Sequence, residues 1–176
     1  VADEARGDAA GEARDTSRGE AADRQEIRFA AREGVLYRRS GDGERPILAL
    51  DSATAPAGVP AVPESWSPAP DVRFGVDATS FRHVAPSPDG RRVAWEAGST
   101  HDLLGVVAAD GSRMTVLDFY FDSSARELAW SPSGRYLAVL HLPPSGLEEV
   151  RVYDAEAGTR LRAPWEESCR PRDGCR

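Results

Sequence analysis

The chain has 176 residues, 40% of them hydrophobic, and a formal net charge of −7. This length can bury the core of one or two domains, but a net acidic chain lacks the basic surface that tracks a phosphate backbone, so we expect no nucleic-acid partner. The longest apolar run, LLGVVAA, is too short to cross a bilayer, and no transmembrane segment is expected.

Residues 1–25 are predicted to be a disordered tether. They are rich in alanine and in acidic residues, and no large apolar residue follows Val1. Such a segment cannot bury enough apolar surface to offset the entropy lost on ordering.

The next two segments differ in composition and in the pattern of their apolar residues. Residues 26–50, EIRFAAREGVLYRRSGDGERPILAL, place short apolar stretches between glycine-containing turn signals, which predicts an antiparallel meander of three strands. Residues 51–71 are rich in proline, alanine and serine. Because proline cannot donate to a sheet ladder, they are predicted to be an extended connector that Trp66, their lone aromatic residue, holds against a surface.

Residues 72–165 contain an internal repeat with an offset of 44 residues. SPDGRRVAW at 87–95 returns as SPSGRYLAV at 131–139, and the two units run from about 84 to 117 and from about 128 to 161. In each turn the serine is expected to accept a backbone hydrogen bond, proline to preset φ, and Gly90 or Gly134 to take a left-handed conformation. The apolar runs that follow, VAW and LAVL, are predicted to be strands buried on both faces. Repeats of this length, built from strands and tight turns, indicate propeller blades.

These two units resemble the WD40-like (PD40) repeats of TolB-type β-propellers. The resemblance covers roughly residues 84–117 and 128–161, and residues 26–50 are interpreted as a degenerate third blade. It implies an all-β fold of antiparallel meander blades. A closed propeller needs at least four blades, so the expected fold is an incomplete propeller, with a β-sandwich or an open barrel as the alternative.

No catalytic, cofactor-binding or metal-binding residues are predicted. The chain contains no GxSxG, P-loop, GxGxxG or HExxH motif. Ser133 is interpreted as a turn residue, and Asp118 and Asp122 as part of a solvated turn between the repeats. The three histidines, His83, His101 and His141, are scattered among different strands and loops, and convergence on a metal ion is the less favoured reading.

The predicted interaction surface is aromatic. Phe119, Tyr120 and Phe121 are consecutive residues in what is expected to be the connector between the repeats. Together with Trp66 in the proline-rich connector, they are the interface candidates, since aromatic anchors dominate interface energetics. Trp95 and Trp130, which flank the repeated turns, are assigned to the core.

The tail, residues 166–176, contains the two cysteines of the chain, Cys169 and Cys175. Their spacing across a proline and an Asp-Gly pair predicts a small disulfide loop; a free thiol pair and a metal site are the alternatives. A disulfide favours an oxidising compartment. We therefore expect a periplasmic or other extracytoplasmic location in a bacterium with a GC-rich genome, a cytoplasmic location being the alternative. The initial Val1 is read as the end left by removal of an export signal, a fragment or a valine-coded start being the other readings.

These observations predict a non-enzymatic protein–protein interaction or scaffold module. Its expected role is that of an extrinsic accessory subunit that stabilises a larger envelope or membrane-associated assembly. Two alternatives remain: the gating propeller of a prolyl-oligopeptidase-type peptidase whose catalytic domain lies elsewhere, and a soluble ligand-binding β protein.

Overall fold

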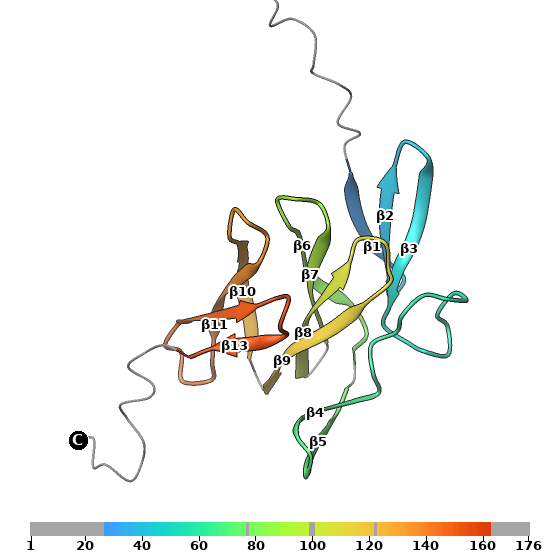
Figure 1. Cartoon of the computed structure of the whole chain (residues 1–176). Helices are drawn as coiled ribbons and strands as arrows, with labels where there is room; N and C mark the ends of the chain where they lie inside the picture. The colour runs from blue at the N-terminus through green and yellow to red at the C-terminus, as the bar shows by residue number, and fades with distance from the viewer. Residues whose placement is uncertain (1–26, 77, 99–100, 122, 163–176) are drawn as a thin grey trace, which may run out of the picture.

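The computed structural model describes residues 27–76, 78–98, 101–121 and 123–162 (Figure 1). Across these residues the fold is all-β, with antiparallel strands and no helix. The described part therefore contains no helix long and apolar enough to cross a membrane. The predicted tether and the predicted disulfide between Cys169 and Cys175 lie outside the described residues.

The strands form three meander sheets and one hairpin, in which neighbours along the chain are neighbours in the sheet. The first sheet contains β1 (Arg28–Arg32), β2 (Val35–Ser40) and β3 (Gly43–Ala49), and the hairpin contains β4 (Ser65–Ala69) and β5 (Val72–Gly75). The second sheet contains β6 (Phe81–Pro86), β7 (Arg92–Gly98), β8 (His101–Ala108) and β9 (Met114–Phe121). The third contains β10 (Ser124–Trp130), β11 (Tyr136–Leu142), β12 (Glu149–Asp154) and β13 (Thr159–Leu161).

The meander predicted for residues 26–50 is confirmed. The β1–β2 turn places Glu33 at φ 50° and Gly34 at φ 73°, two left-handed residues in succession. That conformation is typical of the two-residue hairpin turn, whose twist matches the strands on either side.

The predicted connector differs from the structure in its second half. Ser65–Ala69 forms β4 and pairs with β5, although the ladder is irregular between Trp66 and Ala69. The irregular step contains Pro68, which has no N–H to donate to the ladder. The Ser67 hydroxyl instead donates to the carbonyl groups of Ala69 and Val72 at this point.

The two Ser-Pro-x-Gly turns have the same hydrogen bonds. The Gly90 and Gly134 N–H groups donate to the carbonyls of Ser87 and Ser131, and both glycines have a positive φ, of 67° and 68°. Each serine hydroxyl also accepts the N–H of the residue that opens the next strand, 3.0 Å away in both turns. The sequence repeat is therefore also a structural repeat. Ser133 is a turn residue.

The three meander sheets stand side by side, with the β6–β9 sheet in the middle (Figure 1). Their first strands meet: β1 contacts β6, and β6 contacts β10. Consecutive blades of a propeller have this relation, but no sheet closes into a barrel and the three do not form a ring. The described fold is thus an incomplete, propeller-like array.

Two cores lie on opposite faces of the middle sheet, because successive side chains of a strand point to opposite faces. Val93, Trp95 and Leu103 face the β1–β3 sheet, whereas Ala94 and Leu104 face the β10–β13 sheet. The prediction that VAW is buried on both faces is confirmed, since β7 and β8 are buried along almost their whole length.

A glycine in β8 permits this packing. Gly105 lies directly opposite Trp95 in the ladder, and a Cβ at this position would overlap the indole ring. The fully buried Trp95 therefore requires glycine at position 105.

Candidate functional site

The third sheet buries one face only. Along β11 the odd-numbered Leu137, Val139 and His141 are buried, whereas the even-numbered residues between them are only half-buried. The prediction that LAVL is buried on both faces is therefore wrong. The periodicity of two shows that the described chain places a neighbouring sheet on one side of β10–β13 and nothing on the other.

The uncovered side, which we call the open face, is apolar at its centre. The register places Ala138 opposite Val152 and Leu140 opposite Val150, so these four side chains share it. Val150 is 65% exposed, and Leu161, on the adjoining strand β13, is 43% exposed. Exposed apolar side chains on one continuous surface make this face a candidate interaction site.

The preceding repeat shows what normally covers such a face. Ala138 is equivalent to Ala94 of the second sheet by the offset of 44 residues, and Val150, which lies opposite Leu140, holds the place of Leu104, which lies opposite Glu96. Ala94 and Leu104 are both 0% exposed and lie in the core that the third sheet covers. Equivalent positions are thus buried by a following sheet in one repeat and left open in the other.

At the opposite end of the array, the outer face of the β1–β3 sheet is charged. On the face of β1–β3 that points away from the middle sheet, Arg39 lies opposite both Arg28 and Glu44. Arg32 donates to Glu44 as well, and Arg39 Nη2 lies 2.8 Å from a Glu44 carboxylate oxygen. The Arg32 guanidinium also covers the Tyr37 ring, 4.3 Å from its centroid. The outer face of this sheet is therefore polar, in contrast to the open face.

The aromatic residues predicted as one interface do not form one surface. Phe119, Tyr120 and Phe121 belong to β9 rather than to a connector, so consecutive rings point to opposite faces. Tyr120 is 1% exposed and lies in the second core, which makes it a wrong choice for an interface anchor. Phe119 packs on the first core and stacks on Trp66, with ring centroids 6.2 Å apart. Only Phe121, 57% exposed and stacked on His101, resembles the prediction.

Sequence reasoning missed the open face, although a signal for it was present. Comparing the two repeats position by position, Glu96 in β7 becomes Leu140 in β11. Glu96 is fully buried and accepts a hydrogen bond from the Ala125 N–H at 2.6 Å, across the junction between the sheets. An apolar residue at the equivalent position removes that polar link and leaves a surface suited to apolar contact.

A polar network joins β9 to the third sheet. Asp118 accepts hydrogen bonds from the Tyr153 hydroxyl at 2.5 Å and from Arg151 Nη1 at 3.2 Å. Arg151 also donates to Glu149, whose carboxylate lies 3.2 Å from His141 Nδ1. Asp118 is therefore half-buried in a strand, and its prediction as part of a solvated turn is wrong; Asp122 lies outside the described residues.

This network shifts the ionisation of its members. Burial, reinforced by the positive charge of Arg151, lowers the pKa of His141 and keeps the imidazole neutral. Burial opposes ionisation of Glu149, but hydrogen bonds from Arg151 and His141 outweigh it and lower the pKa of that carboxyl. Burial raises the pKa of both Tyr120 and Tyr153, so both hydroxyls stay protonated.

One part of the network has the hydrogen-bond order of a nucleophile, a base and an acid. The Ser123 hydroxyl lies 3.0 Å from His141 Nε2, and Glu149 lies on the other ring nitrogen. In acyl transfer this order lets the imidazole accept the serine proton. Arg151, however, bonds Glu149 at 2.5 Å, so the carboxylate is already paired and supports a charged imidazole less.

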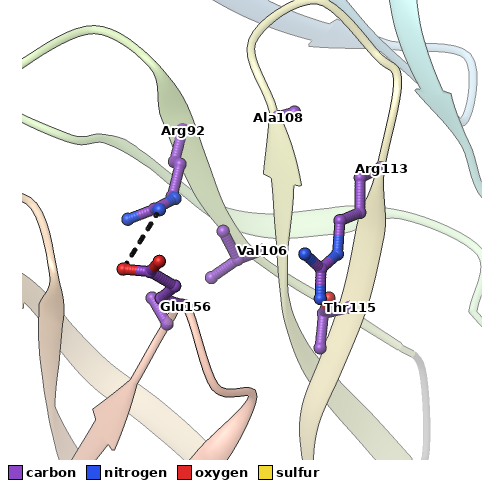
Figure 2. A pocket seen from close by; sticks show the side chains of 7 residues that line it. Arg92, Val106, Ala108, Arg113, Thr115 and Glu156 are labelled. Carbon is purple, nitrogen blue, oxygen red and sulfur yellow. Dashed lines mark ion pairs between the residues drawn. The ribbon is translucent and has the colours of Figure 1, made fainter.

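A small hollow lies between the two repeats, beside Arg92 and Glu156 (Figure 2). These side chains point toward one another, with Arg92 Nη2 3.9 Å from a Glu156 carboxylate oxygen. The hollow has a volume of about 60 Å³. It therefore has room for one or two water molecules at about 30 Å³ each and is far smaller than ordinary ligand pockets of about 300 Å³ or more.

The three histidines lie in different strands, as predicted. His83 Nδ1 is 2.5 Å from the buried Glu96 in the β6–β7 ladder, His101 stacks on aromatic rings, and His141 belongs to the network above. Among the described residues, no group of three or more His, Cys, Asp or Glu side chains is placed to hold a metal ion.

No known protein-family profile matches the chain, and no curated protein is detectably similar to it in sequence. Among solved structures, the chain is similar to the uncharacterized protein lmo1340 of Listeria monocytogenes, with 11% identity, a TM-score of 0.49, and coverage of 78% of this chain and 36% of that one. It is also similar to a "putative 6-phosphogluconolactonase" of Bacteroides fragilis, with 15% identity, a TM-score of 0.41, and coverage of 73% and 32%. The chain thus spans about a third of the length of each. Likenesses this distant identify neither a family nor an activity, and TolB-type membership stays a prediction.

Proposed function

We propose that this chain is a non-enzymatic protein–protein interaction module that binds another polypeptide through the open face of the β10–β13 sheet. One observation carries the proposal: Val150 is 65% exposed on a sheet face whose equivalent in the preceding repeat is buried. Each exposed apolar Å² that a partner covers contributes about 25 cal/mol, so covering this face favours association. The resemblance to TolB-type blades, which serve binding and scaffolding, agrees with this role.

The setting we propose for the module is an extrinsic accessory subunit of a larger envelope or membrane-associated assembly. The two cysteines and the repeat resemblance support an extracytoplasmic location. Co-purification from native membranes followed by mass spectrometry tests this setting. Recovery of the chain from those membranes without any assembly would overturn it.

Thiol labelling tests the binding surface itself. In a background with Cys169 and Cys175 replaced by serine, Val150→Cys is labelled both in native extract and in dilute purified protein. We expect slow labelling in the extract, where the partner covers the face, and fast labelling in the dilute protein. Leu147→Cys is the matched control, because Leu147 is 76% exposed in the loop before β12 and lies off the sheet. Equal labelling of Val150→Cys in native extract, in dilute protein and in concentrated purified protein would contradict the proposal.

A second candidate function, acyl transfer with Ser123 as nucleophile, is favoured by the contacts of Ser123 and Glu149 with His141. A fluorophosphonate probe separates the two candidates. If Ser123 is a nucleophile, its peptide gains the probe mass, and His141→Gln abolishes the gain. The interaction module predicts no labelling of Ser123 in either protein, because Arg151 already neutralises Glu149.

A further inference from the structure

We propose that the polypeptide covering the open face is a second copy of this chain, packed face to face about a twofold axis. The inference rests on the proposed function, since it names the partner of the same surface. Twofold dimers are the commonest symmetric oligomers, and in them one surface patch meets itself.

The charge distribution of the open face suits such a contact. Near a twofold axis each residue lies close to its own copy, so a charged centre would bring like charges together. The centre of this face consists of Ala138, Leu140, Val150 and Val152, and carries no charge. Glu127 lies at one side, opposite Leu140 on the outer strand β10.

The acidic group at the end of the face is already compensated. Asp154 accepts hydrogen bonds from Arg135 Nε at 3.0 Å and from Nη2 at 2.8 Å. The Asp154 carboxylate also accepts the N–H groups of Glu156 and Ala157 in the β12–β13 turn. A second copy therefore need not supply a counter-charge there.

A head-to-tail arrangement of copies is disfavoured by the other end of the array. It would press the open face onto the outer face of β1–β3, where the exposed Arg32 and Arg39 are paired with Glu44. An apolar sheet cannot replace the water around these guanidinium groups, and taking even a paired charge out of water is costly. The face-to-face dimer covers the apolar surface and leaves this charged end in water.

The size of the face sets the expected strength of the dimer. The four strands of this sheet are seven, seven, six and three residues long. At about 3.3 Å per residue and about 4.8 Å per strand they give a face of roughly 360 Å². Two such faces cover about 700 Å², which is below the size of stable interfaces. Sheets packed in this way lie about 10 Å apart with nearly aligned strands. We therefore expect a reversible dimer with a dissociation constant on the order of 10–100 µM.

Sedimentation equilibrium of the full chain from about 1 to 300 µM tests the inference. The expected result is a monomer at the low end and a dimer at the high end. Leu140→Glu brings two carboxylates together across the axis and should raise the dissociation constant at least tenfold. Leu147→Glu, which adds the same charge in the exposed loop outside the sheet, should leave it unchanged.

Labelling of Val150→Cys, in the serine background, distinguishes failure of this inference from failure of the proposed function. Slower labelling as the pure chain is concentrated supports the second copy. A monomer at every concentration, with Val150→Cys protected only in native extract, overturns the second copy but leaves the interaction module in place. A monomer whose Val150→Cys is labelled at the same rate in every sample overturns both.

Discussion

Gly90 and Gly134 hold equivalent turn positions with positive φ of 67° and 68°, but their surroundings differ. A Cβ at Gly90 would meet little more than Ile27 Cδ1 at 3.9 Å, whereas a Cβ at Gly134 would lie 3.1 Å from an Asp89 carboxylate oxygen. That carboxylate is held by the Ser87 hydroxyl at 2.6 Å. Valine should cost about 1–3 kcal/mol of unfolding free energy at either site because of the backbone alone, and more at 134 because of the added crowding.

Urea denaturation of Gly90→Val and Gly134→Val measures this difference. Unchanged stability in both variants would show that the left-handed turn is misassigned. A larger loss at Gly90 would show that Asp89 moves aside freely.

Tyr120 and Trp66 show how the structure changes an expectation at the residue scale. Taken as loop anchors, both could be truncated without unfolding the chain. Tyr120 is instead in the core, so Tyr120→Ala should cost about 3–5 kcal/mol, the range for large buried aromatic residues. Trp66 is half-buried against Phe119, and Trp66→Ala should cost clearly less. Thermal and chemical denaturation of the two single variants measures these losses of stability. Equal losses would contradict the assignment of Tyr120 to the core and of Trp66 to a half-buried site.

At the scale of elements, the network between β9 and the third sheet makes stability depend on pH. The pKa of His141 is lowered below its ordinary value of 6.5, first by burial and then by Arg151. The unfolded chain therefore binds a proton at His141 more readily than the folded chain does. The neutral His141 therefore contributes to the free energy of unfolding in full above about pH 6.5, and this contribution is lost as the pH falls below that value. Glu149 acts at lower pH. Its carboxylate stabilises the fold above pH 4.5, the ordinary pKa of the group, and this stabilisation is lost on further acidification.

Denaturation at pH 7.5 and at pH 5.5, on the wild type and on His141→Gln, isolates this effect. The wild type should lose more stability between the two values than the variant does, because the other titrating groups are common to both. Equal losses would mean that His141 is not desolvated in the folded state.

Much of this organisation can be predicted from sequence, because it is encoded by local residues. The Ser-Pro-x-Gly turns, the offset of 44 residues and the first meander follow from turn chemistry and alternation. The β4–β5 hairpin was missed because proline is a poor ladder residue, and side-chain hydrogen bonds of Ser67 offset that deficit. The exposed side of β11 was missed for a different reason. An apolar strand has the same sequence whether or not a following sheet covers it, and that depends on tertiary neighbours.

At the scale of the whole molecule, the array is charged at its first sheet and apolar at its last. The chain carries a net charge of −7, so two copies repel each other over distances comparable with the Debye length. Raising sodium chloride from about 20 to 300 mM should therefore tighten the dimer severalfold, since screening shortens that length from roughly 20 Å to less than 10 Å. Sedimentation at the two salt concentrations measures the shift. Weaker association at high salt would indicate that opposite charges, rather than the apolar face, hold the copies together.

The central claim is that the last sheet has one packed face and one open face, and two adjacent residues of β11 test it most directly. Val139 is 0% exposed in the second core, whereas Leu140 lies on the open face. Urea denaturation of Val139→Glu and Leu140→Glu, at concentrations low enough to keep the chain monomeric, compares the two faces. We predict that Val139→Glu costs at least about 3 kcal/mol or prevents folding, because it buries a carboxylate without a partner, while Leu140→Glu changes stability by less than about 1 kcal/mol. A loss at Leu140 as large as that at Val139 would contradict the account, because the face would then be packed within the chain itself.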